Sequence, residues 1–266
     1  MATAVPQRDD VDSRADAGPA RRNLERARSL GRYLATPLFL ALVLLALYLY
    51  VSGRELDSIE RRSISSTVIT DRTIEHIQLT AASTAVVVLL AVPMGVLLTR
   101  PAARRFTPAF LAVANIGQAT PSIGLLVLFA IVWTIGFTPA VVALITYAFL
   151  PILRNTMVGL DGVDRSLIEA GRGMGMSKGK ALRTIELPLA VPVILAGVRT
   201  ALVINVGTAA LAWASNAGGL GDIIQTGIST RRDPVLITGA VLTSALALFI
   251  DWLGGIAEDR LRPKGL

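Results

Sequence analysis

The sequence predicts an all-α protein, a polytopic membrane bundle of about six transmembrane helices. Of its 266 residues, 53% are hydrophobic and only 17% are charged, which is too apolar for an ordinary soluble domain. The mean hydropathy is +0.60. The apolar residues gather in separate runs that are long enough to cross a bilayer as helices. The chain has no cysteine, which excludes disulfide and thiol chemistry.

The chain begins with a polar tail over residues 1–32, rich in Arg, Asp and Ala and without apolar periodicity, which predicts disorder. The first span follows at 33–51. It lacks a small-x-small cleavage site at its end, so we interpret it as an uncleaved helix rather than a signal peptide. We expect the next stretch, 52–78, to be a mixed-charge loop that exposes His76, the lone histidine. One histidine cannot supply a His-based cluster, so no metal site is predicted.

The rest of the chain alternates apolar runs with short loops. Five further spans are predicted at 79–99, 108–133, 139–153, 187–213 and 235–256, followed by a cytoplasmic tail at 257–266. Counted over the resulting loops and tails, nineteen Lys and Arg lie on the side of both termini and six on the other side. The positive-inside rule therefore predicts cytoplasmic termini in a cell membrane. The same pattern accounts for the net charge of +7 without a nucleic-acid partner.

Three polar features interrupt the apolar runs. The third span contains Pro121, which predicts a kink or break there. Its neighbours, Gln118, Thr120 and Ser122, either line a translocation path or form helix–helix hydrogen bonds. Arg199, in the fifth span, is either a pathway residue or a structural partner of Asp251 in the sixth span or of backbone carbonyls, and we favour the structural interpretation. The third feature is a glycine run, interpreted as a flexible turn or, by slight preference, a re-entrant element near an outer gate. Its glycines are Gly218, Gly219 and Gly221.

The stretch 161–188 is polar and basic, and we predict two short helices in it. Ser166 and Glu169 have the spacing of a capping box at the start of the first helix. Gly175 is expected to end that helix, and Ser177 to cap the second. Pro188 suits the first turn of the following span.

Such an amphipathic loop either lies on the lipid surface, packs on its own domain, or docks into a partner's groove. In the docking interpretation, small and apolar side chains allow close approach, and Glu169 offers a charge to an Arg across the interface. The chain itself shows no catalytic constellation. In particular, the sequence around Gly179 and Lys180 continues with Ala181, so it lacks the Ser or Thr of a P-loop. We therefore expect no enzyme activity from this chain.

The residues of this loop resemble the EAA motif of ABC importer permeases. The matching positions are Glu169, Ala170, Gly171, Gly175, Ile185, Leu187 and Pro188. The one departure is Gly171, where the motif has alanine. Longer segments at 118–122, 150–156, 171–176, 186–190, 192–201 and 217–222 resemble the permeases of osmoprotectant importers, with Asn216 standing where a small residue is expected.

The resemblance implies a type I ABC importer permease fold, with a permease core at 79–256 and a cytoplasmic coupling loop at 161–188. It implies no cofactor on this chain, and ATP and Mg on a partner ATPase dimer. A second permease copy or paralogue, an extracellular solute-binding protein and membrane lipid would be further partners. The solute would be glycine betaine, choline, carnitine or proline betaine. The alternatives are a permease for methionine, another amino acid or a phosphonate, and an ion-coupled secondary carrier.

Overall fold

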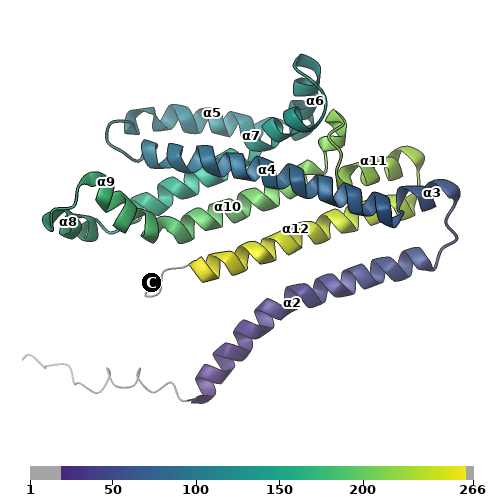
Figure 1. The fold of residues 1–266 in the computed structure, drawn as a ribbon, viewed down its shortest axis with the longest axis horizontal. Coiled ribbons are helices and arrows are strands. Elements are labelled where there is room, and N and C mark those ends of the chain that lie inside the picture. Colours follow the sequence, from purple (N-terminus) through teal and green to yellow (C-terminus); the bar gives the residue numbers. More distant parts are fainter. Residues whose placement is uncertain (1–18, 262–266) are drawn as a thin grey trace, which may run out of the picture.

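The computed structural model describes residues 19–261, which form helices joined by short loops (Figure 1). The described elements in chain order are α2 (Pro19–Ser52), α3 (Ser58–Ser63), α4 (Ser66–Leu98), η1 (Arg104–Phe106), α5 (Thr107–Ala119), α6 (Ser122–Val132), α7 (Phe137–Asp161), α8 (Arg165–Gly173), α9 (Lys178–Ala181), η2 (Leu182–Glu186), α10 (Leu187–Ala209), η3 (Ala212–Ser215), α11 (Leu220–Thr230) and α12 (Asp233–Leu261).

Within residues 19–261, five helices are long and apolar enough to cross a membrane, and α5 and α6 counted as one bent span bring the number to six. These two helices meet at an angle of 94°. The break lies at Thr120 and Pro121, because proline lacks an N–H and disfavours helix in the residue before it. The prediction of an all-α bundle with about six spans and a broken third span is confirmed.

The centre of the bundle is formed by α4, α7 and α10, which pack on one another along most of their length. Small residues let the backbones approach closely. A Cβ added at Gly95 of α4 would lie 2.7 Å from the Thr156 side chain of α7, and one at Gly197 of α10 would lie 2.5 Å from Asn155 Cβ. Buried residues from all three helices form one cluster there, including Val87, Ala91, Leu98, Ala148, Leu150, Ile152, Leu153 and Ala201.

The first helix differs from its prediction at its start. α2 begins at Pro19, so residues 19–32, which we expected to be disordered, are helical. This segment is rich in Ala, Arg and Leu, which are strong helix formers and continue the helix of the span. Residues 1–18 of the predicted tail lie outside the described part. Along the span itself, α2 packs mainly on α12 at one edge of the bundle (Figure 1).

The prediction of a loop over residues 52–78 is wrong for its second half, which is helical. Helix α4 begins at Ser66, where the Ser65 hydroxyl accepts the Val68 N–H at 3.4 Å, and it already contains His76. His76 is fully buried rather than exposed. The polar residues around His76 lower the hydropathy of this segment, so hydropathy alone did not indicate a helix there. The absence of Pro and Gly between residues 66 and 92 was the sequence signal for it.

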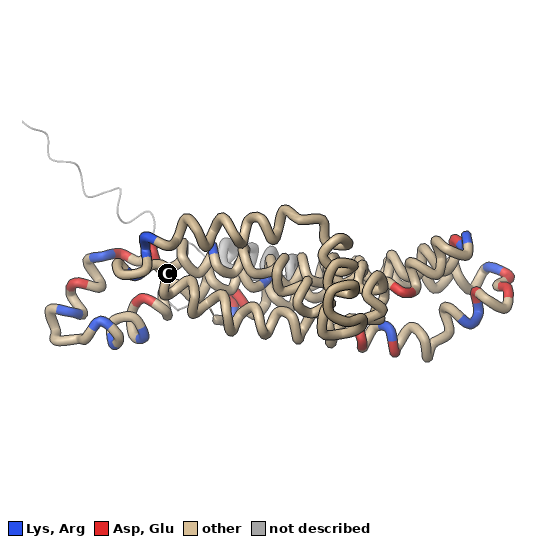
Figure 2. The backbone as a smooth tube through the Cα atoms, turned by 90° about the horizontal axis from the view of Figure 1, so that it is seen from above, with Lys and Arg blue, Asp and Glu red and all other residues tan. Residues whose placement is uncertain are grey.

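The charges divide the molecule into two polar ends and an apolar middle. Figure 2 shows Lys, Arg, Asp and Glu gathered at the two ends of the long axis, with few between them. One end carries α8 and α9, and the other carries α3 and α11 (Figure 1). This is the distribution expected of a bundle whose middle lies in the bilayer.

Candidate functional site

The loop at 161–188 forms the two short helices that were predicted, with a different first cap. Helix α8 starts at Arg165, and its N-cap is Asp164, whose Oδ1 accepts the Ser166 N–H at 2.9 Å. This hydrogen bond lowers the pKa of the Asp164 carboxyl. The predicted capping box at Ser166 and Glu169 is wrong, because the helix begins one residue before Ser166 and Asp164 occupies the capping position.

The other local predictions for this loop are confirmed. Gly175 follows α8 with a φ of +86°, a left-handed conformation that glycine adopts at low cost. The Ser177 hydroxyl accepts the Lys180 N–H at 3.3 Å and caps α9. From α9 the chain continues through the π-helix η2 into α10 without a break, and Pro188 lies in the first turn of α10.

The EAA-like residues Gly171 and Ile185 contact each other in the folded loop. Gly171 is buried, and an added Cβ would lie 2.5 Å from Ile185 Cδ1. The glycine at this position therefore gives Ile185 room to pack against α8. Leu167, Ala170 and Met174 are exposed, with Met174 at 75%. Glu169 is exposed as well. The loop thus presents a small apolar knob beside a carboxylate at the end of the bundle.

Sequence reasoning missed the ion pair that fastens this loop to the bundle. Glu186, at the end of η2, is buried and accepts a hydrogen bond from Arg100 Nη2 at 2.6 Å. Arg100 follows the C-terminus of α4, and its Nε also donates to the Val96 carbonyl at 3.2 Å. The only sequence signal was a charged residue beside an apolar span. The pair connects the loop at 161–188 to the α4–α5 connection.

The polar residues at the broken span do not gather into one site. Gln118 Nε2 lies 3.5 Å from the Tyr147 carbonyl of α7, at the limit of a hydrogen bond, and Thr120 Oγ1 donates to Ile116 within its own helix at 2.8 Å. Pro121 lies at the break as the N-cap of α6, and Ser122 begins that helix. These contacts fit the helix-packing alternative for Gln118 and leave Thr120 half-buried.

The glycine run is closely packed against α4. Gly218 and Gly219 have φ values of +80° and +92°. The Gly219 N–H donates to Glu75 Oε2 at 2.9 Å, and the Leu220 N–H to His76 Nδ1 at 3.3 Å. A Cβ at Gly221 would clash with the Ala210 carbonyl. The run leads into α11, which packs on α12, so the described structure shows it as a closely packed turn.

His76 and Asn205 connect α4 to α10 near the same end. His76 Nε2 lies 3.0 Å from the Val206 carbonyl, so the neutral ring donates there and accepts from Leu220. The buried Asn205 amide donates to Ser83 and Thr84 of α4 at 3.0 and 2.9 Å. Asn216 adopts a left-handed conformation with φ +53°, which Asn tolerates better than most residues and which explains its presence where a small residue was expected.

Arg199 and Asp251 form the pair that we favoured. Arg199 Nε and Nη2 bind the two carboxylate oxygens at 2.6 and 2.7 Å, and Nη1 lies 3.6 Å from Glu258 Oε2. The two side chains are 36% and 39% exposed, so this chain alone does not enclose them. The pair joins α10 to α12.

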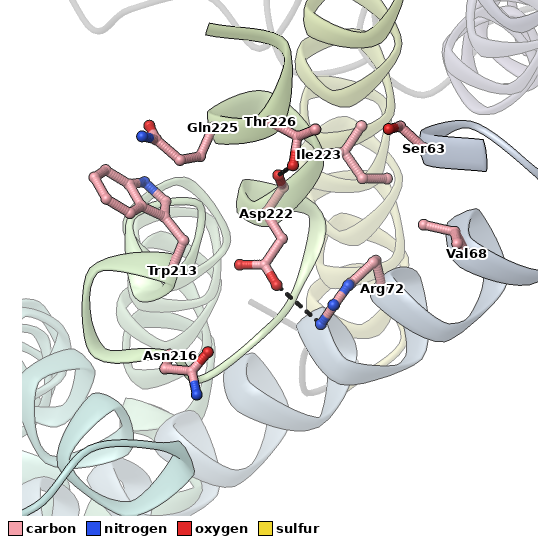
Figure 3. A pocket seen from close by; sticks show the side chains of 9 residues that line it. All are labelled: Ser63, Val68, Arg72, Trp213, Asn216, Asp222, Ile223, Gln225 and Thr226. Atoms are coloured by element: carbon pink, nitrogen blue, oxygen red, sulfur yellow. Dashed lines mark hydrogen bonds and ion pairs between the residues drawn. The ribbon is translucent and has the colours of Figure 1, made fainter. Parts of the chain in front are cut away.

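A polar cavity lies at the end of the bundle opposite α8 and α9. Arg72 Nη1 binds Asp222 Oδ2 at 2.9 Å, and the carboxylate faces the cavity beside Trp213 and Gln225 (Figure 3). Burial raises the pKa of the Asp222 carboxyl, Arg72 opposes this effect, and the Glu75 charge adds to it. The sequence had no pattern that joined these residues, because they come from segments about 140 positions apart.

Comparisons with known proteins agree with this architecture. The family model for the inner membrane component of binding-protein-dependent transport systems matches residues 91–263. The choline transport system permease protein OpuBB of Bacillus subtilis is 42% identical over 73% of this chain and 89% of its own length. The osmoprotectant import permease protein OsmY of Salmonella typhimurium is 40% identical over 85% of this chain and 94% of its own.

Among solved structures, the inward-facing MetNI methionine ABC transporter is similar, with a TM-score of 0.65 and 27% identity over 73% of this chain and 96% of that one. An amino acid ABC transporter, at 19% identity and a TM-score of 0.63, shares the fold. The chain therefore belongs to the family of inner membrane components of binding-protein-dependent transport systems and is an ABC transporter permease.

Proposed function

We propose that this chain is the permease of an ATP-driven importer for quaternary-ammonium and betaine-type osmoprotectants. The observation that carries the proposal is the 40–42% identity, over most of the chain, to permeases named for choline and osmoprotectant transport. The methionine transporter matches at 27% identity, which makes methionine the weaker choice of solute. An ion-coupled carrier is excluded by membership of the ABC permease family.

In this proposal the exposed knob on α8 docks into a separate ATPase subunit. Leu167, Ala170 and Met174 supply the apolar contact, and Glu169 supplies a charge at its edge. Gly175 sets the turn between α8 and α9, and Ile185 packs behind Gly171. ATP and Mg bind the ATPase, and this chain contributes the membrane path and the coupling loop.

The assembly contains two permeases, as identical copies or paralogues, with two ATPases on the cytoplasmic side and a solute-binding protein outside. The Lys and Arg distribution supports cytoplasmic termini and a coupling loop on the same side. In such an assembly the polar break at Gln118, Thr120, Pro121 and Ser122 borders the path. The packed glycines Gly218, Gly219 and Gly221 support the outer gate.

The test is uptake of labelled glycine betaine, choline and carnitine by a host that lacks its own osmolyte importers. The host expresses this chain with its ATPase and solute-binding protein, at high and low salt. We expect ATP-dependent uptake of at least one solute, lost when this chain is omitted. An assembled complex with active ATPase that takes up none of the three would refute the osmoprotectant assignment and leave the permease assignment in place.

A further inference from the structure

The cavity at the outer end has the size of a small-molecule site and is open to solvent. Its volume is about 320 Å³, within the range of pockets that hold small ligands. Four parts of the chain line it: α3 through Ser63, α4 through Arg72, the η3 region through Trp213 and Asn216, and α11 through Asp222, Gln225 and Thr226 (Figure 3). The mechanism described above uses none of these side chains.

The charges around the cavity do not balance. Arg72 Nη1 contacts two carboxylates, Glu75 Oε2 at 2.7 Å and Asp222 Oδ2 at 2.9 Å. One guanidinium therefore faces two carboxylates, which leaves this group with a formal charge of −1 at neutral pH. Glu75 Oε2 also accepts the Gly219 N–H at 2.9 Å, but this backbone group is neutral and does not balance the carboxylate charge. A cation in the cavity would supply the missing positive charge beside Asp222.

An aromatic face lies on the side of the cavity opposite the guanidinium. Figure 3 shows the Asp222 carboxylate between Arg72 and Trp213, with the Gln225 amide beside the indole and the Asn216 amide below it. Indole is the strongest cation–π partner among protein side chains, and aromatic faces recognise quaternary ammonium groups, which cannot donate hydrogen bonds. Asn216 and Gln225 offer amide donors to the carboxylate or hydroxyl that such solutes also carry.

We propose that this cavity binds the quaternary ammonium group of the transported solute on the permease itself. Trp213 and Asp222 contact the ammonium group, and Arg72, Asn216 and Gln225 face its polar tail. This inference rests on the proposed osmoprotectant function. The cavity lies at the end of the bundle opposite the coupling loop, where a solute released outside would enter. Its affinity would be weak, because the cavity is open to solvent and supplies one ring.

The experiment measures binding of choline to the intact permease–ATPase complex in lipid nanodiscs without solute-binding protein. Saturation-transfer NMR on the ligand methyl protons reports weak binding directly. The neutral isostere 3,3-dimethyl-1-butanol has the same shape without the charge. We expect choline to bind at least about tenfold more tightly than this alcohol, because the alcohol gains neither the carboxylate nor the cation–π attraction.

Variants then locate the site. Trp213→Leu should weaken choline binding about tenfold, and Trp213→Phe, which keeps a weaker aromatic face, about threefold. Asp222→Asn should weaken choline binding and leave binding of the alcohol unchanged. Trp133→Leu is the matched control, since Trp133 is an exposed tryptophan that does not line the cavity, and it should leave choline binding unchanged.

Several results would overturn the inference: no choline binding by the wild-type complex, equal binding of choline and the alcohol, or unchanged binding in Trp213→Leu. If the complex does not assemble with Trp213→Leu or Asp222→Asn, choline binding is measured with Trp213→Phe and Gln225→Ala instead. Unchanged choline binding in both of these variants rejects the site. Normal uptake of betaine with no effect of these variants would reject this site alone. Absence of osmoprotectant uptake would reject the proposed function, whatever the binding result.

Discussion

The ion pair between Arg100 and Glu186 gives a sharp test of how the coupling loop is attached. The two side chains differ in exposure, at 34% for Arg100 and 8% for Glu186, and they meet at 2.6 Å. Removing one partner of a buried pair costs about 3–5 kcal/mol, whereas an exposed pair contributes about 0–1 kcal/mol. Because one partner is exposed and the other is buried, we expect a coupling free energy of about 2 kcal/mol.

The difference in exposure between Arg100 and Glu186 also predicts which single variant lowers the melting temperature more. Arg100→Gln leaves the Glu186 carboxylate buried without its cation, whereas Glu186→Gln leaves a guanidinium that water reaches. Arg100→Gln should therefore lower the melting temperature of the complex more than Glu186→Gln does. A coupling of about 2 kcal/mol corresponds to about 4–8 °C for a chain of this size.

The assay is a double-mutant cycle on the thermal unfolding of the purified complex, with Arg104→Gln as the control. Arg104 is an exposed arginine of the same connection, and its replacement should leave the melting temperature unchanged. If the double variant shows the sum of the two single shifts, the side chains do not interact. That result, or a larger effect of Glu186→Gln than of Arg100→Gln, would refute the reasoning.

Three further predictions address the coupling loop and the polar contacts of the bundle. Glu169→Ala should reduce co-purification with the ATPase and reduce transport while membrane insertion is retained; unchanged docking and transport would remove Glu169 from the interface. Asp164→Ala should speed amide hydrogen exchange in α8 because it removes the Ser166 N–H acceptor, whereas Ser166→Ala should not; equal exchange in both would contradict the assigned cap. Arg199→Leu should lower the melting temperature because it leaves Asp251 without its bidentate partner; normal stability with lost transport would instead assign Arg199 to the path.

Local rules predicted much of the fold from sequence. The break at Pro121, the left-handed Gly175, the Ser177 cap and Pro188 at the start of α10 each depend on a few neighbouring residues. Their backbone preferences act over one or two helical turns, so a single sequence contains the information. Apolar runs likewise predicted the spans, since burial in a bilayer requires about twenty apolar residues in succession.

Contacts between distant segments were not predictable in this way. His76 was assigned to an exposed loop, but it is buried because Val206 and Leu220, over 100 positions later, supply its hydrogen-bond partners. The Arg72–Asp222 pair depends in the same way on a tertiary contact. Arg199 and Asp251 were predictable as a pair because charges within apolar spans are rare, which leaves few partners to choose from.

The helix continues from α9 through η2 into α10 without a break, so a rigid rotation at one end would move the other end. Residues Lys178–Ala209 form one 32-residue rod that starts in the coupling loop. At 1.5 Å per residue the rod is about 48 Å long, so a tilt of about 10° at the loop displaces its far end by about 8 Å. That far end carries the Val206 carbonyl, which meets His76. A rotation of the rod at its α9 end would therefore strain this hydrogen bond at the opposite end of the bundle.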